Sequence, residues 1–141
     1  MSQFTDDLAG LPLFSEASRA ELADIRRNLT QLPVSAGRVL LREGAPGHEF
    51  MIIAEGHVTV SQGGSTVAVL ERGDLVGEMA LLDGNGVGRR NATVVASTDA
   101  MIYVGSRAEF RQILDIAPSF ASKVRETAAA RAVDRTVDRA A

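Results

Sequence analysis

Hydrophobic and polar positions change their spacing twice along this chain of 141 residues. Over residues 4–30, and again after Ser106, apolar side chains recur every three to four positions, which is typical of helices that bury one face. Between Pro33 and Ser106, short runs rich in Val, Ile and Thr are bounded by glycine-containing turns, as in antiparallel strands. The pattern predicts helices, then a compact β structure, then helices again.

Both helical regions contain a capping signal. Ser18 is followed three residues later by Glu21, and Ser106 is followed in the same way by Glu109, which is the capping-box pattern. Pro118 interrupts the C-terminal region, because proline removes a helical hydrogen bond. Beyond it, the alanine-rich sequence predicts a last helix that frays toward the C-terminus.

The central region predicts a small β-roll. Its strand-like runs are residues 37–44, 49–62, 65–74, 92–98 and 100–106. Gly63 and Gly64 separate two of these runs and predict a tight hairpin, because paired glycines supply the positive φ of such a turn. Short strands at near-regular intervals indicate an antiparallel barrel or double-sheet roll.

The predicted fold class is therefore α+β. We expect an antiparallel β-roll, a double-sheet jelly-roll-like barrel, flanked by N-terminal and C-terminal helices. A single domain should span 1–141, with N-terminal helices over 1–31, the roll over 32–105 and C-terminal helices over 106–141.

Composition narrows the classes of function. The net charge is -3, whereas a nucleic-acid-binding domain is more often basic. The absence of cysteine excludes a disulfide scaffold and a thiolate metal site. The N-terminal residues do not show a signal-peptide pattern, so we expect no cleavable signal, and no apolar run reaches the length of a membrane span. We expect a cytoplasmic protein, and the residue usage favours a bacterial source.

Candidate chemistry lies in the segment "GEMALLDGNGVGRRNATVV", residues 77–95. Gly77 allows a ligand to approach the backbone closely, and the helix formers after it would present N–H groups to an anion. Arg90 suits a phosphate because its planar fork donates two charge-assisted hydrogen bonds. Glu78 can accept hydrogen bonds from hydroxyl groups. A phosphorylated sugar meets these demands, and a surface ion pair between Glu78 and Arg89 or Arg90 is the alternative.

This segment resembles the phosphate-binding cassette of the cyclic nucleotide-binding domain family, which includes the catabolite activator protein, protein kinase A regulatory subunits and cyclic nucleotide-gated channels. The cassette corresponds to residues 76–93. Upstream, Gly44, Gly47 and Gly56 match the glycines of the family's hairpin. The stretches "LPLFSEASRAELADI" and "FRQILDIAPSFASKV" resemble its N-terminal and C-terminal helices.

The resemblance implies a role for each matching residue. Glu78 would accept the ribose 2′-hydroxyl, Gly77 would lie against the ribose, and Arg90 would face the cyclic phosphate. Backbone N–H groups near Ala80 and Asn91 would bind the exocyclic oxygens. The implied ligand-binding residues are Gly77, Glu78, Met79, Ala80, Arg90, Asn91 and Ala92, with Val76, Arg89, Thr93, Arg131 and Arg135 as further candidates.

The chain departs from the family pattern at three places. The loop before the arginines is longer than usual and contains several glycines, which leaves Arg89 as an alternative phosphate ligand to Arg90. We favour Arg90 because it directly precedes Asn91. Asn91 itself replaces the usual Ala, Ser or Thr, and His48 replaces an acidic residue.

The implied function is a non-enzymatic sensor that binds cAMP, or else cGMP, and needs no cofactor or metal. Its C-terminal helices would relay binding to a partner protein or a second copy, without nucleic acid. One alternative is a ligand-free scaffold of the same fold. Another is a cupin-type metalloenzyme, which usually requires several histidines around one metal, whereas this chain has only His48 and His57.

Overall fold

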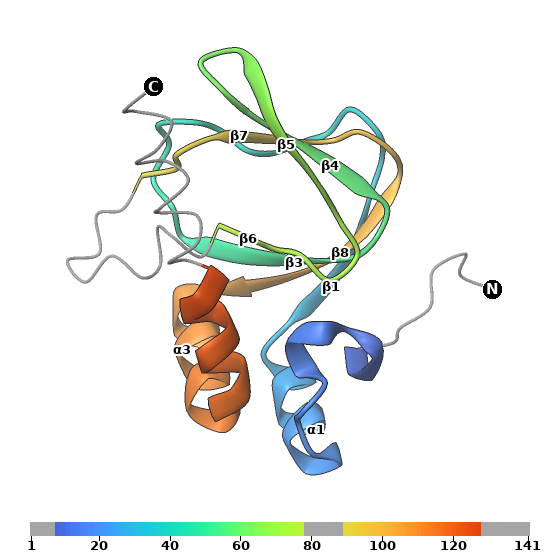
Figure 1. Cartoon of the computed structure of the whole chain (residues 1–141), viewed down its shortest axis with the longest axis vertical. Helices are drawn as coiled ribbons and strands as arrows, with labels where there is room; N and C mark the ends of the chain where they lie inside the picture. Colours follow the sequence, from blue (N-terminus) through green and yellow to red (C-terminus); the bar gives the residue numbers. More distant parts are fainter. Residues whose placement is uncertain (1–7, 78–88, 128–141) are drawn as a thin grey trace.

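The structure, a computed structural model, describes residues 8–77 and 89–127. Within these residues the strands form two four-stranded antiparallel sheets, in the orders β1-β8-β3-β6 and β2-β7-β4-β5 (Figure 1). The strands are β1 (Thr30–Val34), β2 (Val39–Leu41), β3 (Glu49–Glu55), β4 (His57–Gln62), β5 (Ser65–Glu71), β6 (Leu75–Val76), β7 (Thr93–Ala96) and β8 (Ala100–Ser106). The predicted β-roll is confirmed.

Helices cover one face of the first sheet (Figure 1). They are the short 3-10 helices η1 (Leu8–Gly10) and η2 (Pro12–Phe14), then α1 (Arg19–Arg27), α3 (Arg107–Ile116) and a further helical stretch at residues 118–127. The molecule therefore has three layers: helices, the β1-β8-β3-β6 sheet, and the β2-β7-β4-β5 sheet.

The middle layer is apolar on both faces because it separates two cores. In β3, Phe50 and Ile52 belong to the core under the helices, whereas Met51 and Ile53 belong to the core inside the roll. Successive side chains of a strand point to opposite faces, so both cores draw on consecutive residues of one strand. This explains why β3 shows a continuous apolar run and no alternation with polar residues.

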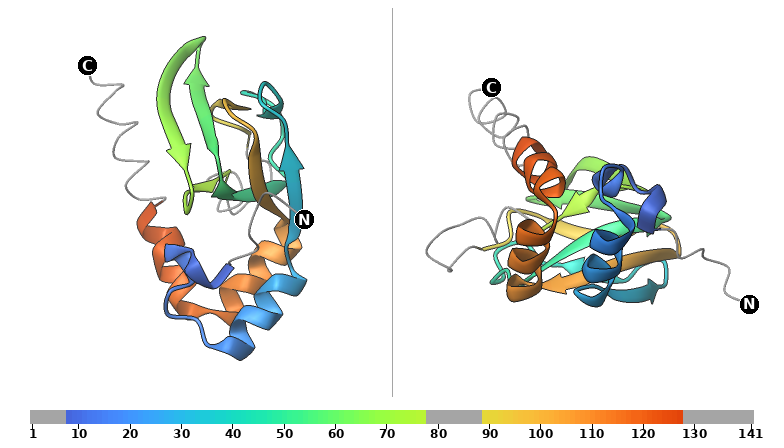
Figure 2. Two further views of the ribbon diagram at one scale, coloured as in Figure 1. Left: turned by 90° about the vertical axis from the view of Figure 1, so that its right-hand side faces the viewer. Right: turned by 90° about the horizontal axis from the view of Figure 1, so that it is seen from below.

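A pair of phenylalanine rings packs the N-terminal and C-terminal helices against each other. The rings of Phe14 and Phe120 are stacked with their centroids 5.1 Å apart. Beside them, Lys123 Nζ donates to the carbonyl of Pro12 at 2.6 Å and to the hydroxyl of Ser15 at 2.7 Å. In Figure 2 the two segments lie side by side, although they are far apart in the sequence. The N-terminal and C-terminal helical segments therefore pack together within the helical layer.

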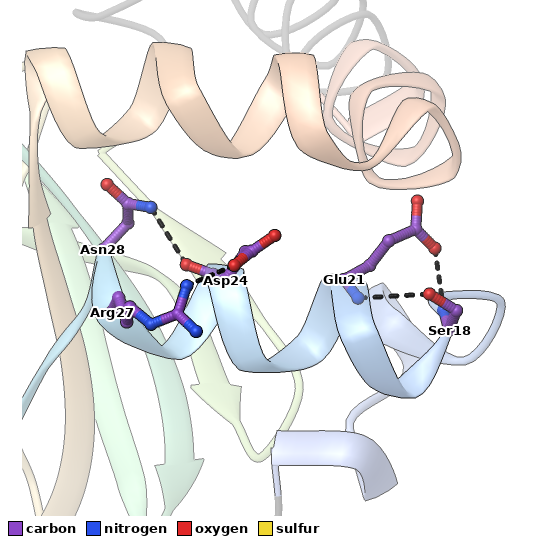
Figure 3. A network of polar contacts seen from close by, with 5 residues as sticks. All are labelled: Ser18, Glu21, Asp24, Arg27 and Asn28. Carbon is purple, nitrogen blue, oxygen red and sulfur yellow. Dashed lines mark hydrogen bonds and ion pairs between the residues drawn. The ribbon is translucent and has the colours of Figure 1, made fainter.

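The predicted capping boxes are both confirmed. Ser18 Oγ accepts from the backbone N–H of Glu21 at 3.1 Å, and Glu21 Oε1 accepts from the N–H of Ser18 at 2.7 Å (Figure 3). The same reciprocal pair joins Ser106 and Glu109 at the start of α3. Each box satisfies two backbone donors that a helix leaves unpaired at its first turn.

The C-terminal end of α1 is also held by local polar contacts. Asp24 pairs with Arg27, and the Asn28 side chain donates to the Asp24 carbonyl at 3.0 Å (Figure 3). The helix ends at Arg27, so the predicted helical region over residues 4–30 extends too far. Thr30 already belongs to a strand.

Strand β1 was not predicted at all, because Pro33 and the polar residues around it look like a loop. β1 lies at the edge of its sheet and pairs only with β8 among the described strands. Proline is tolerated on an edge strand, where its missing N–H removes no ladder hydrogen bond. The predicted single run over 49–62 likewise divides at Gly56 into β3 and β4.

Gly56 makes the turn between β3 and β4 with a φ of 91°. A Cβ there would lie 2.5 Å from the carbonyl oxygen of Asp99. The two strands therefore enter opposite sheets through a position that only glycine fits.

Candidate functional site

Arg90 and Gly77 meet beside the start of β3. Val76 ends β6, paired with Met51, and Gly77 follows it with a φ of 86°. Arg90 Nη1 donates to the Gly77 carbonyl at 3.2 Å, and its Nη2 donates to the Glu49 carbonyl at 2.7 Å. The structure thus brings together two of the predicted site residues across 13 positions of sequence.

Arg90 is a buried cation. Its exposed fraction is 8%, and it is the single charged residue in the buried set of the described residues. Burying a charge is costly unless it is hydrogen-bonded, and bonds from a guanidinium to carbonyl oxygens supply part of that compensation. A buried arginine fixed in this way is already oriented before any anion arrives.

Gly77 and the Arg90 guanidinium are in such close contact that a side chain would not fit between them. A Cβ at Gly77 would lie 2.7 Å from Arg90 Nη1 and 3.1 Å from the Glu49 carbonyl oxygen. The glycine is therefore required for two reasons, namely its left-handed backbone and the space that the guanidinium occupies.

Arg89 lies elsewhere. Its side chain is exposed and donates through Nη1 to the Gly44 carbonyl at 3.0 Å. Its backbone forms an isolated antiparallel bridge with Pro46. The two adjacent arginines thus have different surroundings, and Arg90 is the one placed against Gly77.

Asn91, Ala92 and Thr93 lead from Arg90 into β7. Asn91 is exposed and its carbonyl accepts from Gln62 Nε2 at 3.1 Å. Thr93 Oγ1 accepts from the backbone N–H of Glu43 at 3.1 Å. These bonds tie the segment after Arg90 to the β2–β3 connection and to the end of β4.

Glu43 also contacts the β4–β5 hairpin, because its Oε1 accepts from the backbone N–H of Gly63 at 3.0 Å. The Gly63–Gly64 turn has the predicted positive φ values of 57° and 84°. Neither Glu43 nor Gln62 was predicted to take part, since a polar residue beside a turn carries no distinctive sequence signal.

Backbone hydrogen bonds join the β2–β3 connection, residues 42–48, to Arg90 and Arg107. The backbone N–H of Gly44 donates to the Arg90 carbonyl at 2.9 Å, and that of Arg90 donates to the Ala45 carbonyl at 2.8 Å. Arg107, the first residue of α3, donates through its backbone N–H to the His48 carbonyl at 3.1 Å. Arg107 was not predicted as a site residue, because its partners are main-chain atoms.

Five of the predicted residues lie outside the described part of the chain: Glu78, Met79, Ala80, Arg131 and Arg135. His48 and His57 are both exposed. His57 pairs with Glu71 at 3.5 Å across β4 and β5. Over residues 8–77 and 89–127, no group of three or more His, Asp or Glu side chains is arranged to hold a metal ion.

None of the described helices combines the length and the apolar character that crossing a bilayer requires.

Comparison with known proteins identifies the domain. A family profile described as "Cyclic nucleotide-binding domain" matches residues 31–116. The chain is 36% identical over 121 residues to a cyclic nucleotide-gated potassium channel of Rhizobium etli, covering 86% of this chain and 33% of the channel. It is 37% identical over 123 residues to the acetyltransferase Pat of Mycolicibacterium smegmatis, covering 84% of this chain and 36% of that protein.

A solved structure agrees with these relatives. The catabolite activator protein of Thermus thermophilus superposes with a TM-score of 0.77 and 26% identity, covering 90% of this chain and 61% of that one. The chain spans about a third of the length of the two curated relatives above. The shared part is the roll with its flanking helices, and this chain belongs to the cyclic nucleotide-binding domain family.

Proposed function

We propose that this chain binds a cyclic nucleotide beside Gly77 and Arg90 and acts as a non-enzymatic sensor. The observation that carries the proposal is the buried Arg90 guanidinium, held against Gly77 and the Glu49 carbonyl. A cyclic nucleotide brings one negative phosphate to such a cation. A guanidinium carries five N–H donors, so it can hold backbone carbonyls and a phosphate oxygen together.

The missing side chain at Gly77 lets the Arg90 guanidinium lie directly against its backbone. A ribose phosphate ring that lies against this main chain would therefore bring its phosphate to Arg90. In the proposed complex, Glu78 accepts a ribose hydroxyl and the backbone near Ala80 and Asn91 binds the phosphate oxygens, as the family resemblance implies.

Removal of Arg90 should weaken binding strongly. A hydrogen bond to a charged group contributes about 1.5–3 kcal/mol, and about 1.4 kcal/mol corresponds to a factor of ten in affinity. A phosphate held by one such bond predicts a loss of roughly 10-fold to 150-fold in Arg90→Ala, and a second bond would make the loss larger.

We propose cAMP as the preferred ligand, on the basis of the resemblance to bacterial cAMP sensors. Binding would then change the packing of the C-terminal helices, which would transmit the signal to a partner protein or to a second copy. This follows the general rule that a ligand shifts a conformational equilibrium through its different affinity for the two states.

Calorimetric titration with cAMP and with cGMP tests the proposal. We expect saturable binding with tighter binding of cAMP, and losses in Glu78→Ala and Arg90→Ala. Arg89→Ala is the matched control, because it removes the same charge from the adjacent exposed position. An equal loss in Arg89→Ala would reassign the phosphate ligand. If neither nucleotide binds below high micromolar concentration, the domain is a scaffold and the sensor proposal fails.

A further inference from the structure

Strand β5 differs from the other edge strands of the roll. Over the described residues the two sheets end in β1, β6, β2 and β5. β1 contains Pro33, β6 has two residues, and β2 has three residues flanked by Arg38 and Arg42. Proline, shortness and charge are features that keep an edge strand from pairing with another chain. β5 has seven residues, no proline, and no charged residue before Glu71.

Two exposed apolar side chains lie on this same strand. Val67 is 50% exposed and Val69 is 59% exposed, and across residues 8–77 and 89–127 no other large hydrophobic side chain is exposed. A single exposed valine is ordinary, whereas these two lie two positions apart on one face of one edge strand. A short uncharged segment rich in β-branched residues is the kind of strand that pairs readily with another strand.

Val69 ends a row of β-branched residues that crosses the whole sheet. The pairing registers place the members of this row side by side in the order Val39, Val95, Thr59 and Val69. Their neighbours along the strands pack into the core inside the roll, so the row faces outward. The described helices cover the other sheet (Figure 1). A further strand beside β5 would extend this row past the edge of the sheet.

The main chain of β5 has free directions of pairing on the side away from β4. The N–H of Glu71 donates to Asp74 Oδ2 at 2.8 Å, and the Glu71 carbonyl accepts from the Asp74 N–H at 3.0 Å. These groups are therefore directed away from β4. Because main-chain groups alternate in direction along a strand, those of Val69 point toward the same edge. The register with β4 skips Val67 and is regular over residues 68–71.

We propose that β5 pairs with the β5 of a second copy of this chain, antiparallel about a two-fold axis at Ala68. In this register each Val67 lies opposite the partner's Val69, so the exposed valines of both copies cover one another. The two Glu71 carboxylates lie at opposite ends of the paired strands, whereas a parallel arrangement would place like charges side by side. The contact is closed, because the same strand of each copy forms it.

A second copy is the partner that the composition of β5 favours. A charged peptide would find no opposite charge on residues 65–70, whereas an identical strand presents valines to valines. One pair of strands is a small interface, so the dimer should form reversibly as the protein concentration rises. This association needs no nucleotide and goes beyond the proposed sensor function.

Analytical ultracentrifugation over a wide range of protein concentration tests the pairing. The unaltered chain should pass from monomer to dimer, and Val69→Lys should remain monomeric because it places a charge against apolar groups at the edge. Gln31→Lys is the matched control, since it adds the same charge at an exposed position of the edge strand β1, and it should dimerise like the unaltered chain. Val67→Lys replaces Val69→Lys if the latter does not fold, as judged by circular dichroism.

Two results would overturn the proposal. A chain that stays monomeric at every concentration would leave the edge of β5 to an extended segment of another protein. A dimer that persists in folded Val69→Lys would rest on another surface. Titration with cAMP is measured separately, so a dimer that binds no nucleotide would contradict the sensor function and leave the pairing of β5 intact.

Oxidative cross-linking tests the register, because the chain contains no cysteine of its own. Ala68→Cys would bring two thiols together on the axis, and directly opposed side chains in an antiparallel pair are close to the separation that a disulfide requires. Thr66→Cys is more exposed on the same strand but would lie opposite the partner's Leu70. Ala68→Cys should therefore cross-link faster, and adding Val69→Lys should slow it. Equal or faster cross-linking of Thr66→Cys would overturn the proposed pairing.

Discussion

Replacing Gly77 with alanine should damage both stability and binding, because two separate costs arise at one position. The backbone φ of 86° is left-handed, which costs a residue with a Cβ roughly 1–2 kcal/mol. The new Cβ would also lie 2.7 Å from Arg90 Nη1. Displacing the guanidinium from a carbonyl forfeits a charge-assisted bond of about 1.5–3 kcal/mol. The sum is a loss of roughly 2.5–5 kcal/mol of unfolding free energy.

Gly37→Ala is the control that separates the cost of the left-handed backbone from the cost of displacing the guanidinium. Gly37 has a φ of 93°, and nothing lies within 4 Å of the Cβ that would be added. It should therefore lose only the backbone term of roughly 1–2 kcal/mol. Urea denaturation of both variants at 25 °C measures the difference, and calorimetry with cAMP should show at least a tenfold weaker complex for Gly77→Ala alone. Equal losses of stability, with unchanged affinity, would refute the argument that the guanidinium occupies the space beside Gly77.

Three further substitutions test the surrounding architecture by denaturation. Ser106→Ala removes the capping box of α3 and should cost about 1 kcal/mol, whereas a loss near zero would mean that the cap is energetically irrelevant. Phe120→Ala empties a position that contacts Phe14 and Phe110 and should cost about 3–5 kcal/mol, so a loss below 1 kcal/mol would contradict the observed packing. Gly105→Ala forces a Cβ against the Phe50 ring and should cost about 1–3 kcal/mol or more through overpacking, and a neutral result would show that the ring can move away.

Local signals explain which parts of the fold could be predicted. The capping boxes at Ser18 and Ser106 and the hairpin at Gly63–Gly64 depend on neighbouring residues alone, and each appears where the sequence placed it. Strand β1 was missed because its stability comes from pairing with β8, about 70 residues away, and not from its own composition. Pro33 reads as a chain break until the edge position of the strand is known.

Only part of the site could be predicted from the sequence, because some of its contacts also join residues that are far apart along the chain. Adjacency to Asn91 favoured Arg90 over Arg89, and the structure does place Arg90 against Gly77. Arg90 also donates to the carbonyl of Glu49, 41 positions away. Every residue has a carbonyl group, so no side-chain pattern marks this contact. The same holds for Arg107, whose partners are also main-chain oxygens.

The position of Arg90 at the start of β3 places it beside both cores. β3 is shared between two cores, with Phe50 on the helical side and Met51 on the roll side. Backbone pairing with Val76 and Val104 holds Met51 in the plane of its sheet, and the ring of Phe50 packs against that of Phe110 on α3. Arg90 bonds to the Glu49 carbonyl directly before these two residues. It therefore holds the strand at the point where its side chains divide between the two cores.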